Sequence, residues 1–278
     1  MFSGIKENIL LKNYTTFKIG GPARYFIKLK SKKDLIKAVI FAKQRKLPFF
    51  VLGGGSNLLV SDKGFNGLII KIQNSGIKIQ NNFLEQKTIY VESGAKLSDL
   101  LNLTADKSLT GLEWAIGIPG TIGGAIAGNA GAFEKSIKDV VKKIEVFDTK
   151  KQEIRVLENK DCKFSYRDSI FKHKKNLIIL SAEFQFKTGS KEKIKNKIKK
   201  YLNYRKNSQP INFFSSGSIF KNPKNVSAGK LIEECGLKSK KNGCAQISEK
   251  HANFIVNLGG AQANNVLELI KIIKKKVR

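Results

Sequence analysis

The chain has 278 residues, of which 41% are hydrophobic, and its formal net charge at pH 7 is +30. A chain of this length and apolar content folds into roughly two domains with a core, which excludes a disordered protein. Its beginning lacks the apolar region of a secretory signal, no segment approaches the roughly 18 apolar residues of a membrane span, and the three cysteines form no C-x-x-C pair. We therefore expect a cytoplasmic protein with reduced thiols, no membrane span and no metal site.

The positive charge could indicate a nucleic-acid-binding protein, because a basic face is the footprint of phosphate binding. However, 46 of the 52 basic residues are lysine, whereas arginine makes the bidentate contacts that nucleic-acid recognition favours. The lysines are also scattered along the chain. We therefore predict solvated lysine surfaces and no nucleic-acid partner, although the positive field would attract small anions. Nucleic-acid binding stays the competing hypothesis from a different functional class.

Apolar periodicity predicts the elements of the first part of the chain. Alternation predicts an edge strand over residues 23–31, and helical spacing predicts a helix over residues 31–47 with Ser31 as its N-cap. Residues 48–60 are expected to form a buried strand, a glycine turn and a second apolar strand. The beginning of the chain therefore combines strands with at least one helix.

The remaining elements continue this mixture. Short strands separated by Asn and Gly turns are predicted over residues 64–95, and helical spacing returns over residues 96–114. Strands follow over residues 141–186, with a hairpin near residues 149–151. A charged helix over residues 190–210 ends before a proline and is the best candidate for a domain boundary.

Two further helices are expected over residues 226–237 and 264–277. Helices thus alternate with small sheets, and this order predicts the α+β class.

Residues 117–133 form a glycine-rich run in which six of seventeen residues are glycine and none is serine, lysine or an acid. Ile118, Ile122 and Ile126 interrupt the run, and a flexible linker would have no use for them. We expect these isoleucines to anchor the run in a core, while its glycines let the backbone lie against a flat ligand or a pyrophosphate. The glycines in question are Gly117, Gly120, Gly123 and Gly124.

A second glycine-rich loop, LGGGSN at residues 52–57, follows an apolar strand. Successive backbone N–H groups of such a loop can surround phosphate oxygens, and Ser56 and Asn57 could add side-chain donors. A tight turn is an equally good interpretation of this loop alone. Neither loop matches the G-x-G-x-x-G or G-x-x-x-x-G-K-[ST] fingerprint. Together, however, the two loops suit a ligand with two ends.

Two polar segments could contribute chemistry. In SYRDSIF, Arg167 stands beside an aromatic residue and an acid, and the alternative is a surface pair with Asp168. In SSGSIFKNP, Ser218 lies between small residues, with Lys221 and Asn222 close behind it, and the alternative is a serine turn before a strand. Ser218 lacks the G-x-S-x-G elbow of serine hydrolases.

The two histidines are distant in sequence, so neither a zinc site nor a Ser–His mechanism is expected. His173 lies in a basic segment and should be exposed. His251 enters an apolar strand, where it could pack at the core edge or contact a substrate. Trp114 is expected in the core.

Seven segments together match a known enzyme family in order and spacing. They are NYTTFKIGGPARYF, VLGGGSNLLVSDKGFNGLII, GLEWAIGIPGTIGGAIAGNAGAF, SYRDSIFK, GSIFKNP, AGKLIEECGLK and SEKHANFIVN. On these segments the chain resembles the UDP-N-acetylenolpyruvoylglucosamine reductases (UDP-N-acetylmuramate dehydrogenases), the flavoenzymes of bacterial peptidoglycan precursor synthesis. The short interval between Arg167 and Ser218 resembles the subgroup that lacks an additional tyrosine loop.

The resemblance implies an α+β architecture, namely a PCMH-type FAD-binding fold of two α+β subdomains plus a smaller α+β substrate domain. The implied boundaries place FAD-binding subdomain 1 at residues 1–72, FAD-binding subdomain 2 at residues 73–200 and the substrate-binding domain at residues 201–278. A monomer is favoured.

The resemblance also implies FAD and NADPH as cofactors and a UDP-sugar as substrate. NADPH would reduce FAD, and the reduced flavin would then pass hydride to the enolpyruvyl group, giving UDP-N-acetylmuramate. Arg167 would stabilise the developing negative charge, and Ser218 would donate the proton. The positions that match FAD contacts are Gly53, Gly54, Gly55, Ser56, Asn57, Gly117, Ile118, Pro119, Gly120, Thr121, Gly123 and Gly124. The positions that match substrate contacts are Lys221, Asn222 and His251.

The chain departs from the family pattern at its C-terminus. The third catalytic group of the family is a glutamate on a strand beyond the last helix, whereas this sequence ends in that helix, where Glu268 does not match the motif. The substrate domain is therefore expected to be truncated. The alternative function is an FAD-binding protein of the same fold whose catalysis is impaired or lost.

Overall fold

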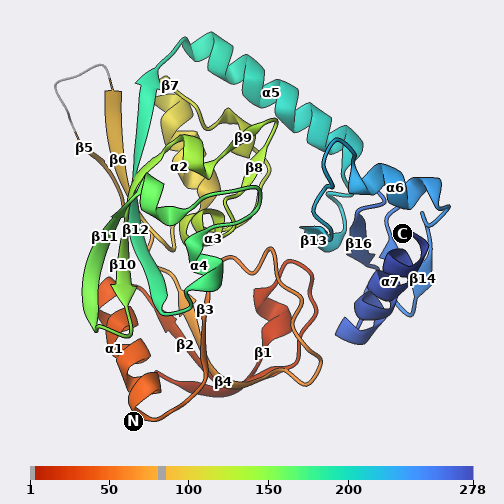
Figure 1. Ribbon diagram of the computed structural model, residues 1–278, viewed down its shortest axis with the longest axis horizontal. Helices are drawn as coiled ribbons and strands as arrows, with labels where there is room; N and C mark the ends of the chain where they lie inside the picture. Colours follow the sequence, from red (N-terminus) through yellow and green to blue (C-terminus); the bar gives the residue numbers. More distant parts are fainter. Residues whose placement is uncertain (1–3, 81–85, 278) are drawn as a thin grey trace. The chain divides into compact units, whose positions relative to one another are not determined.

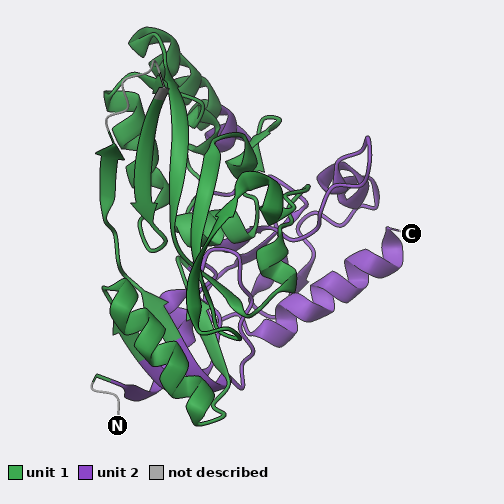
Figure 2. Cartoon of the chain, turned by 60° about the vertical axis from the view of Figure 1, so that its left-hand side comes forward, with its two compact units in different colours: residues 1–4, 27–54, 70–203 green, residues 5–26, 55–69, 204–278 purple. Residues whose placement is uncertain are grey.

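The computed structural model describes residues 4–80 and 86–277 (Figure 1). These residues form two compact units, and each unit is assembled from separate stretches of the chain (Figure 2). Unit 1 holds residue 4 and the described residues of 27–54 and 70–203, and unit 2 holds those of 5–26, 55–69 and 204–277. The three-part division into residues 1–72, 73–200 and 201–278 stays a prediction about function.

Unit 1 contains a six-stranded antiparallel sheet in the order β11-β10-β12-β6-β5, with β7 paired to β12 outside this path (Figure 1). Its strands are β5 (Ile77–Gln80), β6 (Gln86–Glu92), β7 (Leu109–Thr110), β10 (Val141–Asp148), β11 (Glu153–Glu158) and β12 (Leu177–Thr188). The predicted hairpin is confirmed, because Asp148 lies opposite Glu153 at the end of the β10–β11 pair. Residues 81–85, which belong to the strands predicted over 64–95, lie outside the described residues.

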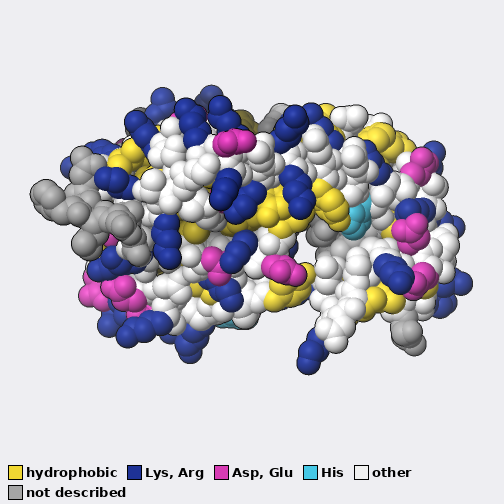
Figure 3. Space-filling model, turned by 90° about the horizontal axis from the view of Figure 1, so that it is seen from above, with side chains coloured by type: hydrophobic (Ala, Val, Ile, Leu, Met, Phe, Trp, Pro, Cys, Tyr) yellow, Lys and Arg dark blue, Asp and Glu magenta, His cyan; other side chains and the backbone are white. Residues whose placement is uncertain are grey.

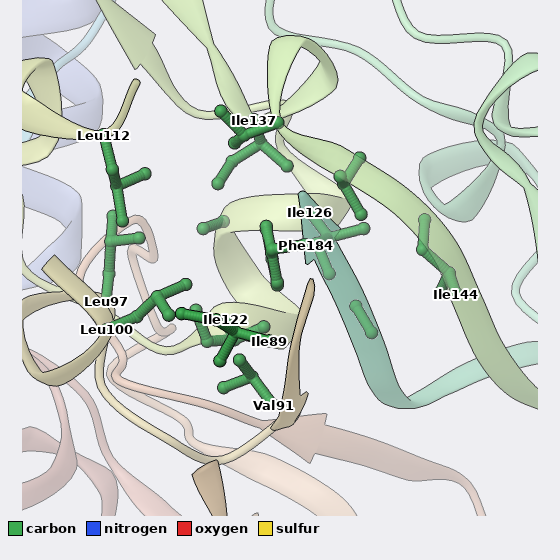
Figure 4. Close-up of a cluster of buried hydrophobic side chains, with 14 of the residues drawn as sticks. Ile89, Val91, Leu97, Leu100, Leu112, Ile122, Ile126, Ile137, Ile144 and Phe184 are labelled. Atoms are coloured by element: carbon green, nitrogen blue, oxygen red, sulfur yellow. The ribbon is translucent and has the colours of Figure 1, made fainter. Parts of the chain in front are cut away.

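The core of unit 1 lies between this sheet and the short helices that follow β6. Figure 4 shows Ile122 and Ile126 pointing toward Ile89 and Phe184 of the sheet, together with side chains of the preceding helix. The helices of unit 1 are α1 (Lys32–Gln44), α2 (Leu97–Asp106), α3 (Ile122–Ala127) and α4 (Ile170–His173), and α5 (Lys191–Ser208) belongs to unit 1 up to residue 203 and to unit 2 beyond it. Trp114 is 2% exposed, which confirms its predicted place in the core.

The predicted role of the isoleucines is confirmed, although the glycine-rich run differs from the loop that we expected. Ile122 and Ile126 are fully buried, and Ile118 packs against the same cluster. The difference is that they lie on or beside the helix α3, which glycine would disfavour by propensity. The N-cap Thr121 accepts a hydrogen bond from the Gly124 N–H, and burial of the isoleucines adds the tertiary packing that stabilises short helices.

The helix predictions hold with one exception. Ser31 caps α1 by accepting a hydrogen bond from Asp34 N–H, and α5 ends before Pro210 as predicted. The prediction of helical structure over residues 96–114 is wrong after α2, because Ser108 adopts a left-handed φ of 55°. The chain there turns into β7, which pairs with β12.

A four-stranded sheet has the order β1-β2-β4-β3, and two predictions about it are wrong. Its strands are β1 (Lys6–Leu10), β2 (Pro22–Leu29), β3 (Phe49–Leu52) and β4 (Phe65–Ile72). Strand β2 is not an edge strand, because β1 and β4 flank it. Residues 58–60 are not a strand: Leu59 instead packs on the core of unit 2.

Unit 2 contains a sheet in the order β13-β16-β15-β14. Its elements are β13 (Phe214–Ser218), α6 (Ala228–Glu234), β14 (Lys241–Asn242), β15 (Ala245–Ile247), β16 (Phe254–Asn257) and α7 (Ala263–Lys276). Both predicted C-terminal helices are therefore present. Phe17 and Ile19, from the beginning of the chain, are buried in the same cluster as Ile255 and Leu269. The core of this unit thus needs segments from both ends of the sequence.

Polar contacts also join the distant segments of unit 2. The Asn257 side chain donates to the Phe17 carbonyl oxygen over 2.9 Å. Asp62 accepts from the Ala263 N–H over 2.8 Å at the N-terminus of α7, where a carboxylate also complements the helix dipole. These contacts fix the N-terminal stretches against the C-terminal sheet and helix.

The smaller elements complete the described chain. They are the strand pair β8 (Gly131–Ala132) and β9 (Lys135–Ser136) and the 3-10 helices η1 (Leu11–Tyr14), η2 (Glu113–Ala115), η3 (Ile137–Asp139) and η4 (Asn159–Cys162). Basic side chains are dispersed over the face seen in Figure 3. Within the described residues, no helix has the length and apolar character of a membrane span, and no group of His, Cys, Asp and Glu side chains could hold a metal.

Candidate active site

The structure brings the two glycine-rich segments into direct contact inside unit 1. A Cβ atom on Gly54, which follows β3, would lie 2.7 Å from the Cα of Gly120, which precedes α3. A Cβ atom on Gly53 would overlap the Thr121 hydroxyl oxygen. Side chains larger than hydrogen would therefore force the two segments apart. Glycine is needed here for close approach of two backbones.

The first turn of α3 has little free hydrogen-bonding capacity for a phosphate. The N–H groups of Ile122 and Gly123 donate to Ala95 and Ser93 carbonyl oxygens over 2.9 and 2.8 Å. The Gly124 N–H faces the Thr121 hydroxyl. These three N–H groups of the glycine-rich run are therefore already bonded within the protein. The run also offers an exposed backbone position at Gly124, where an added Cβ would meet only the Thr121 oxygen at 3.6 Å.

Lys71 supports the LGGGSN loop, and the sequence analysis did not identify it as a site residue. Its ammonium donates to the Gly53 carbonyl oxygen, and burial, reinforced by the charge of Lys28, lowers the pKa of Lys71 below its ordinary value. A lysine in an otherwise apolar strand, GLIIKI, was the available signal. The side chain fixes the carbonyl and places a positive charge beside the loop.

The second half of the LGGGSN loop belongs to unit 2. Gly55 has a left-handed φ of 67°, and a Cβ atom on it would overlap the Tyr14 carbonyl oxygen. The Thr16 N–H donates to the Gly55 carbonyl oxygen over 3.1 Å. Ser56 is half-buried and Asn57 is exposed. The segment around Thr16 therefore sets the direction of the chain through this loop.

Arg167 lies on a tight turn of unit 1. The N–H and carbonyl groups of Ser165 and Asp168 bond to each other over 3.1 Å in both directions, and Arg167 between them has a left-handed φ of 56°. Its guanidinium donates to the Gly131 carbonyl oxygen over 2.6 Å and lies 5.2 Å from the Tyr166 ring centre. The half-buried guanidinium is thus held by backbone that ends the glycine-rich run.

The last residues of the glycine-rich run also anchor this turn. The Asn129 side chain, in a residue that is 3% exposed, donates to the Ser165 carbonyl oxygen over 2.8 Å. The Ser169 hydroxyl donates to the Ala127 carbonyl oxygen over 2.8 Å. Asp168 bonds to His173, whose side chain is 69% exposed as predicted. These bonds favour a built site over the alternative of a simple Arg–Asp surface pair.

Unit 2 holds the other predicted site residues. Ser218 is exposed, ends β13 and lies opposite Phe254 of β16, directly after Gly217 with its φ of 80°. Lys221 and Asn222 are exposed in the segment that follows. The Asn222 side chain accepts from the Ala228 N–H over 3.1 Å, which also gives it a role in starting α6.

His251 occupies the core edge of unit 2. Its Nδ1 accepts from the Asn253 N–H over 3.2 Å, and its ring packs 4.9 Å from the Phe254 ring and beside Gly229. Burial lowers the pKa of His251 below its ordinary value. The neutral ring with Nδ1 as acceptor carries its proton on Nε2. Contact of this imidazole with a substrate stays a prediction.

The site residues thus form two groups, each described within its own unit. Gly53, Gly54, Gly120, Thr121 and Arg167 belong to unit 1. Ser218, Lys221, Asn222 and His251 belong to unit 2.

Comparison with known proteins shows the family of this chain. A model described as "FAD binding domain" matches residues 23–157, and a model described as "UDP-N-acetylenolpyruvoylglucosamine reductase, C-terminal domain" matches residues 209–278. A UDP-N-acetylenolpyruvoylglucosamine reductase from Caldanaerobacter subterraneus subsp. tengcongensis is 45% identical over 96% of this chain and 87% of its own length. The chain belongs to the UDP-N-acetylenolpyruvoylglucosamine reductase family. A reductase from Caldicellulosiruptor bescii is also 45% identical, over 96% of this chain and 84% of its own length.

Solved structures of other proteins have the fold described above. The crystal structure of a UDP-N-acetylenolpyruvylglucosamine reductase from Thermus caldophilus superimposes with a TM-score of 0.84 at 36% identity, covering 98% of this chain and 96% of that one. A histidine-to-alanine mutant of a cholesterol oxidase from Brevibacterium sterolicum shares the fold over 66% of this chain and 38% of that one, with a TM-score of 0.52 at 14% identity. The predicted family and the α+β FAD-binding fold are confirmed.

The glycine contacts of this reductase fit FAD. Both glycine-rich segments fall within the residues matched by the FAD-binding model. Gly54 meets the Gly120 backbone, Gly53 meets the Thr121 side chain, and Gly124 leaves open space for an added Cβ except toward the Thr121 oxygen. A bulky dinucleotide with a flat ring needs such a wall of bare backbone. The reductase is an FAD-dependent oxidoreductase that uses NADPH.

Proposed function

We propose that this reductase uses NADPH to reduce the enolpyruvyl group of UDP-N-acetylenolpyruvoylglucosamine, giving UDP-N-acetylmuramate for peptidoglycan precursor synthesis. The observation that carries the proposal is the double use of one glycine-rich run in unit 1. Its first part meets Gly54 through Gly120, and its last part bonds to the turn of Arg167 through Asn129 and Gly131. The wall of the cofactor site and a cationic group for the substrate therefore share one rigid segment.

FAD, when bound, takes reducing equivalents from NADPH and supplies them to the substrate. We assign its contacts to the predicted positions in both loops, with Lys71 as an additional support through the Gly53 carbonyl oxygen. The lysine charge stands where an anionic group near the loop would be stabilised. The close Gly54–Gly120 contact supports the glycine loops as the wall beside the cofactor.

We assign Arg167 to the substrate carboxylate. The negative charge that develops beside this carboxylate during reduction is best stabilised by a cation already in place. The bond to Gly131 and the closed turn hold the guanidinium without any rearrangement of the backbone. The planar guanidinium can bind the carboxylate through two parallel hydrogen bonds.

We assign Ser218 as the proton donor to the substrate carbon next to the carboxylate. Its exposed position at the end of β13 supports this role. Lys221 would attract the diphosphate of the UDP-sugar, and Asn222 and His251 would contribute hydrogen bonds to the same substrate. The exposure of Lys221 and Asn222 supports these contacts.

Further proposals follow from the family. We assign FAD binding to residues 1–72 and 73–200 and substrate binding to residues 201–278, supported by the family models at 23–157 and 209–278. We also propose a cytoplasmic monomer of the subgroup without the tyrosine loop. Neither the structure nor the comparisons favour the alternative in which the same fold has lost its reaction.

Purified protein tests the proposal. We expect visible flavin absorbance and NADPH oxidation that depends on added UDP-N-acetylenolpyruvoylglucosamine. A colourless protein that takes up no FAD on reconstitution and binds nucleic acid instead would overturn the flavoenzyme assignment. A yellow protein whose NADPH oxidation ignores the UDP-sugar would support the alternative of a fold without the reaction.

A further inference from the structure

Asn253 forms a buried bracket around the backbone that follows Ser218. The residue is 2% exposed, and its carboxamide makes two hydrogen bonds with one residue of the neighbouring segment. The Phe220 N–H donates to the Asn253 Oδ1 over 2.9 Å, and the Asn253 Nδ2 donates to the Phe220 carbonyl oxygen over 2.9 Å. The Ile219 N–H also donates to the Asn253 backbone carbonyl over 2.8 Å.

The Asn253–Phe220 hydrogen bonds lie where the pairing of β13 with β16 becomes irregular. Strand β13 pairs with β16 at Ser215 and again at Ser218, with an irregularity between them, and β13 ends at Ser218. Beyond that point the Phe220 backbone groups would need another partner, because buried backbone N–H and carbonyl groups are nearly always bonded. The carboxamide of Asn253 supplies both a donor and an acceptor, as a neighbouring strand would.

Thr16 holds the other end of the same segment. Its hydroxyl donates to the Ser215 carbonyl oxygen over 2.7 Å, and its N–H donates to the Gly55 carbonyl oxygen over 3.1 Å. The backbone from Ser215 to Phe220 is thus fixed at both ends, with Ser218 between the two supports. This stretch of residues 215–220 is called the serine arc below.

We propose that Asn253 is a positioning residue for Ser218: its carboxamide fixes the backbone of the serine arc so that the Ser218 hydroxyl is held where the substrate carbon takes its proton. The inference rests on the proposed function. In that step the hydroxyl hydrogen would move from Ser218 Oγ to the carbon beside the carboxylate, and bound reduced flavin would supply hydride to the neighbouring carbon. The exposed Ser218 oxygen would then recover its proton from water. Asn253 touches neither reacting carbon and acts through the arc.

The central test replaces Asn253 with Asp in the FAD-loaded protein. Asn253→Asp keeps the acceptor for the Phe220 N–H but places a carboxylate oxygen against the Phe220 carbonyl oxygen. A displacement of about 1 Å can cost about 100-fold in rate. We therefore expect reoxidation of the NADPH-reduced protein by the UDP-sugar to slow by about 10- to 100-fold, with reduction by NADPH unchanged and a larger solvent deuterium isotope effect.

A double variant separates positioning from general damage. Ser218→Ala should slow the same reoxidation by about 10²- to 10⁴-fold, as expected for loss of a proton donor. Asn253→Asp should then have no further effect in the Ser218→Ala background, because groups that act as one unit are not additive. The same fold-loss in both backgrounds would overturn the positioning role alone. An unchanged rate for Ser218→Ala by itself would overturn the proposed role of Ser218, and the inference with it.

Asn257→Asp is the matched control. Asn257 lies on the same unit, is 3% exposed and also donates to a distant backbone carbonyl, but its partner is Phe17 and not the serine arc. We expect Asn257→Asp to lower the denaturation midpoint without enlarging the isotope effect. An isotope effect as large as that of Asn253→Asp would contradict the inference.

If Asn253→Asp does not fold, Thr16→Val tests the same positioning role at the other end of the serine arc. This variant preserves side-chain shape and removes only the hydroxyl bond to Ser215. We expect a several-fold slower reoxidation with an enlarged isotope effect, and again no further effect in the Ser218→Ala background. A normal isotope effect in Thr16→Val would count against the serine arc as a positioning device.

Discussion

The turn of Arg167 and the serine arc present two predicted catalytic side chains in different ways. The Arg167 turn closes on itself, because Ser165 and Asp168 bond to each other in both directions. The serine arc has no such internal closure and is fixed at its ends by Thr16 and Asn253. Each region uses a buried asparagine. Asn129 adds a bond to a turn that is already closed, whereas Asn253 supplies the hydrogen bonds of a neighbouring strand to the Phe220 backbone, beyond the end of β13.

This difference predicts how each site fails. Damage to the supports of Arg167 should appear mainly as lost stability, since the turn retains its own hydrogen bonds. Damage to the supports of the serine arc should appear mainly as lost rate in the substrate half of the reaction. Variants at both regions, at the cofactor wall and at His251 test this separation.

Arg167→Lys should have the largest effect. Lysine keeps the charge but cannot form two parallel hydrogen bonds to a carboxylate, and removal of one preorganised stabilising group costs about 10²–10³ in rate. We expect slow reoxidation by the UDP-sugar with normal FAD content, measured by stopped-flow absorbance. Arg155→Lys is the matched control, because Arg155 pairs with Asp148 and Glu153 on the β10–β11 hairpin. Near-normal turnover of Arg167→Lys would favour the surface-pair interpretation.

Asn129→Ala tests the self-supporting turn. The substitution removes one of the two donors to the Ser165 carbonyl oxygen, which keeps its bond from the Asp168 N–H, and it takes the side-chain acceptor away from the Lys138 N–H. The loss should lower the free energy of unfolding by about 1–3 kcal/mol. Reoxidation by the UDP-sugar should slow less than in Asn253→Asp. Urea denaturation and stopped-flow measurements on both variants check this order. A larger rate loss in Asn129→Ala, without loss of stability, would reverse the comparison of the two regions.

Gly124→Ala separates the cofactor wall from folding. An added Cβ meets only the Thr121 oxygen at 3.6 Å, and alanine in a helix is favoured over glycine by about 0.5–1 kcal/mol. The FAD-free protein should therefore gain stability, while FAD binding weakens by about tenfold, which is about 1.4 kcal/mol. Flavin fluorescence titration and thermal denaturation measure the two effects. Stronger FAD binding in Gly124→Ala would remove Gly124 from the cofactor wall.

His251 should give the smallest effect, through pH. The pKa of His251 is lower in the folded protein than its ordinary value of 6.5. As the pH falls below 6.5, His251 is therefore protonated in the unfolded chain before it is protonated in the folded protein. Stability should be independent of this group above that pH and should decline below it, by at most about 1.4 kcal/mol per pH unit. His251→Gln should remove this decline between pH 7 and pH 5.5, whereas His173→Gln, at an exposed position, should retain it. A decline that survives in His251→Gln would exclude His251 as its source.

Local patterns predicted much of this fold. Ser31 followed by helical spacing correctly placed the start of α1, and the isoleucines of the glycine-rich run correctly indicated a buried anchor. Periodicity alone did not identify α3, because glycine intrinsically disfavours a helix. This helix is stabilised by tertiary burial of its isoleucines, which the local pattern does not contain. Periodicity also did not show that β2 has neighbours on both sides, since strand order depends on the whole chain.

The supports of the predicted site depend on contacts that no short pattern contains. Thr16 and Ser215 are 199 residues apart, and Asn253 and Phe220 are 33 residues apart. Lys71 was the exception, because a charged residue inside a buried strand already signals a special partner. Sequence motifs thus identified candidate reacting groups, while the structure was needed to show what holds them.

Anaerobic mixing of the NADPH-reduced protein with UDP-N-acetylenolpyruvoylglucosamine tests the proposed function most directly. We expect the visible flavin absorbance to return in a single reaction that consumes one UDP-sugar per flavin and forms UDP-N-acetylmuramate. The same mixture without the sugar should stay reduced. A flavin that remains reduced in the presence of the UDP-sugar would contradict the assignment of this chain as an active reductase.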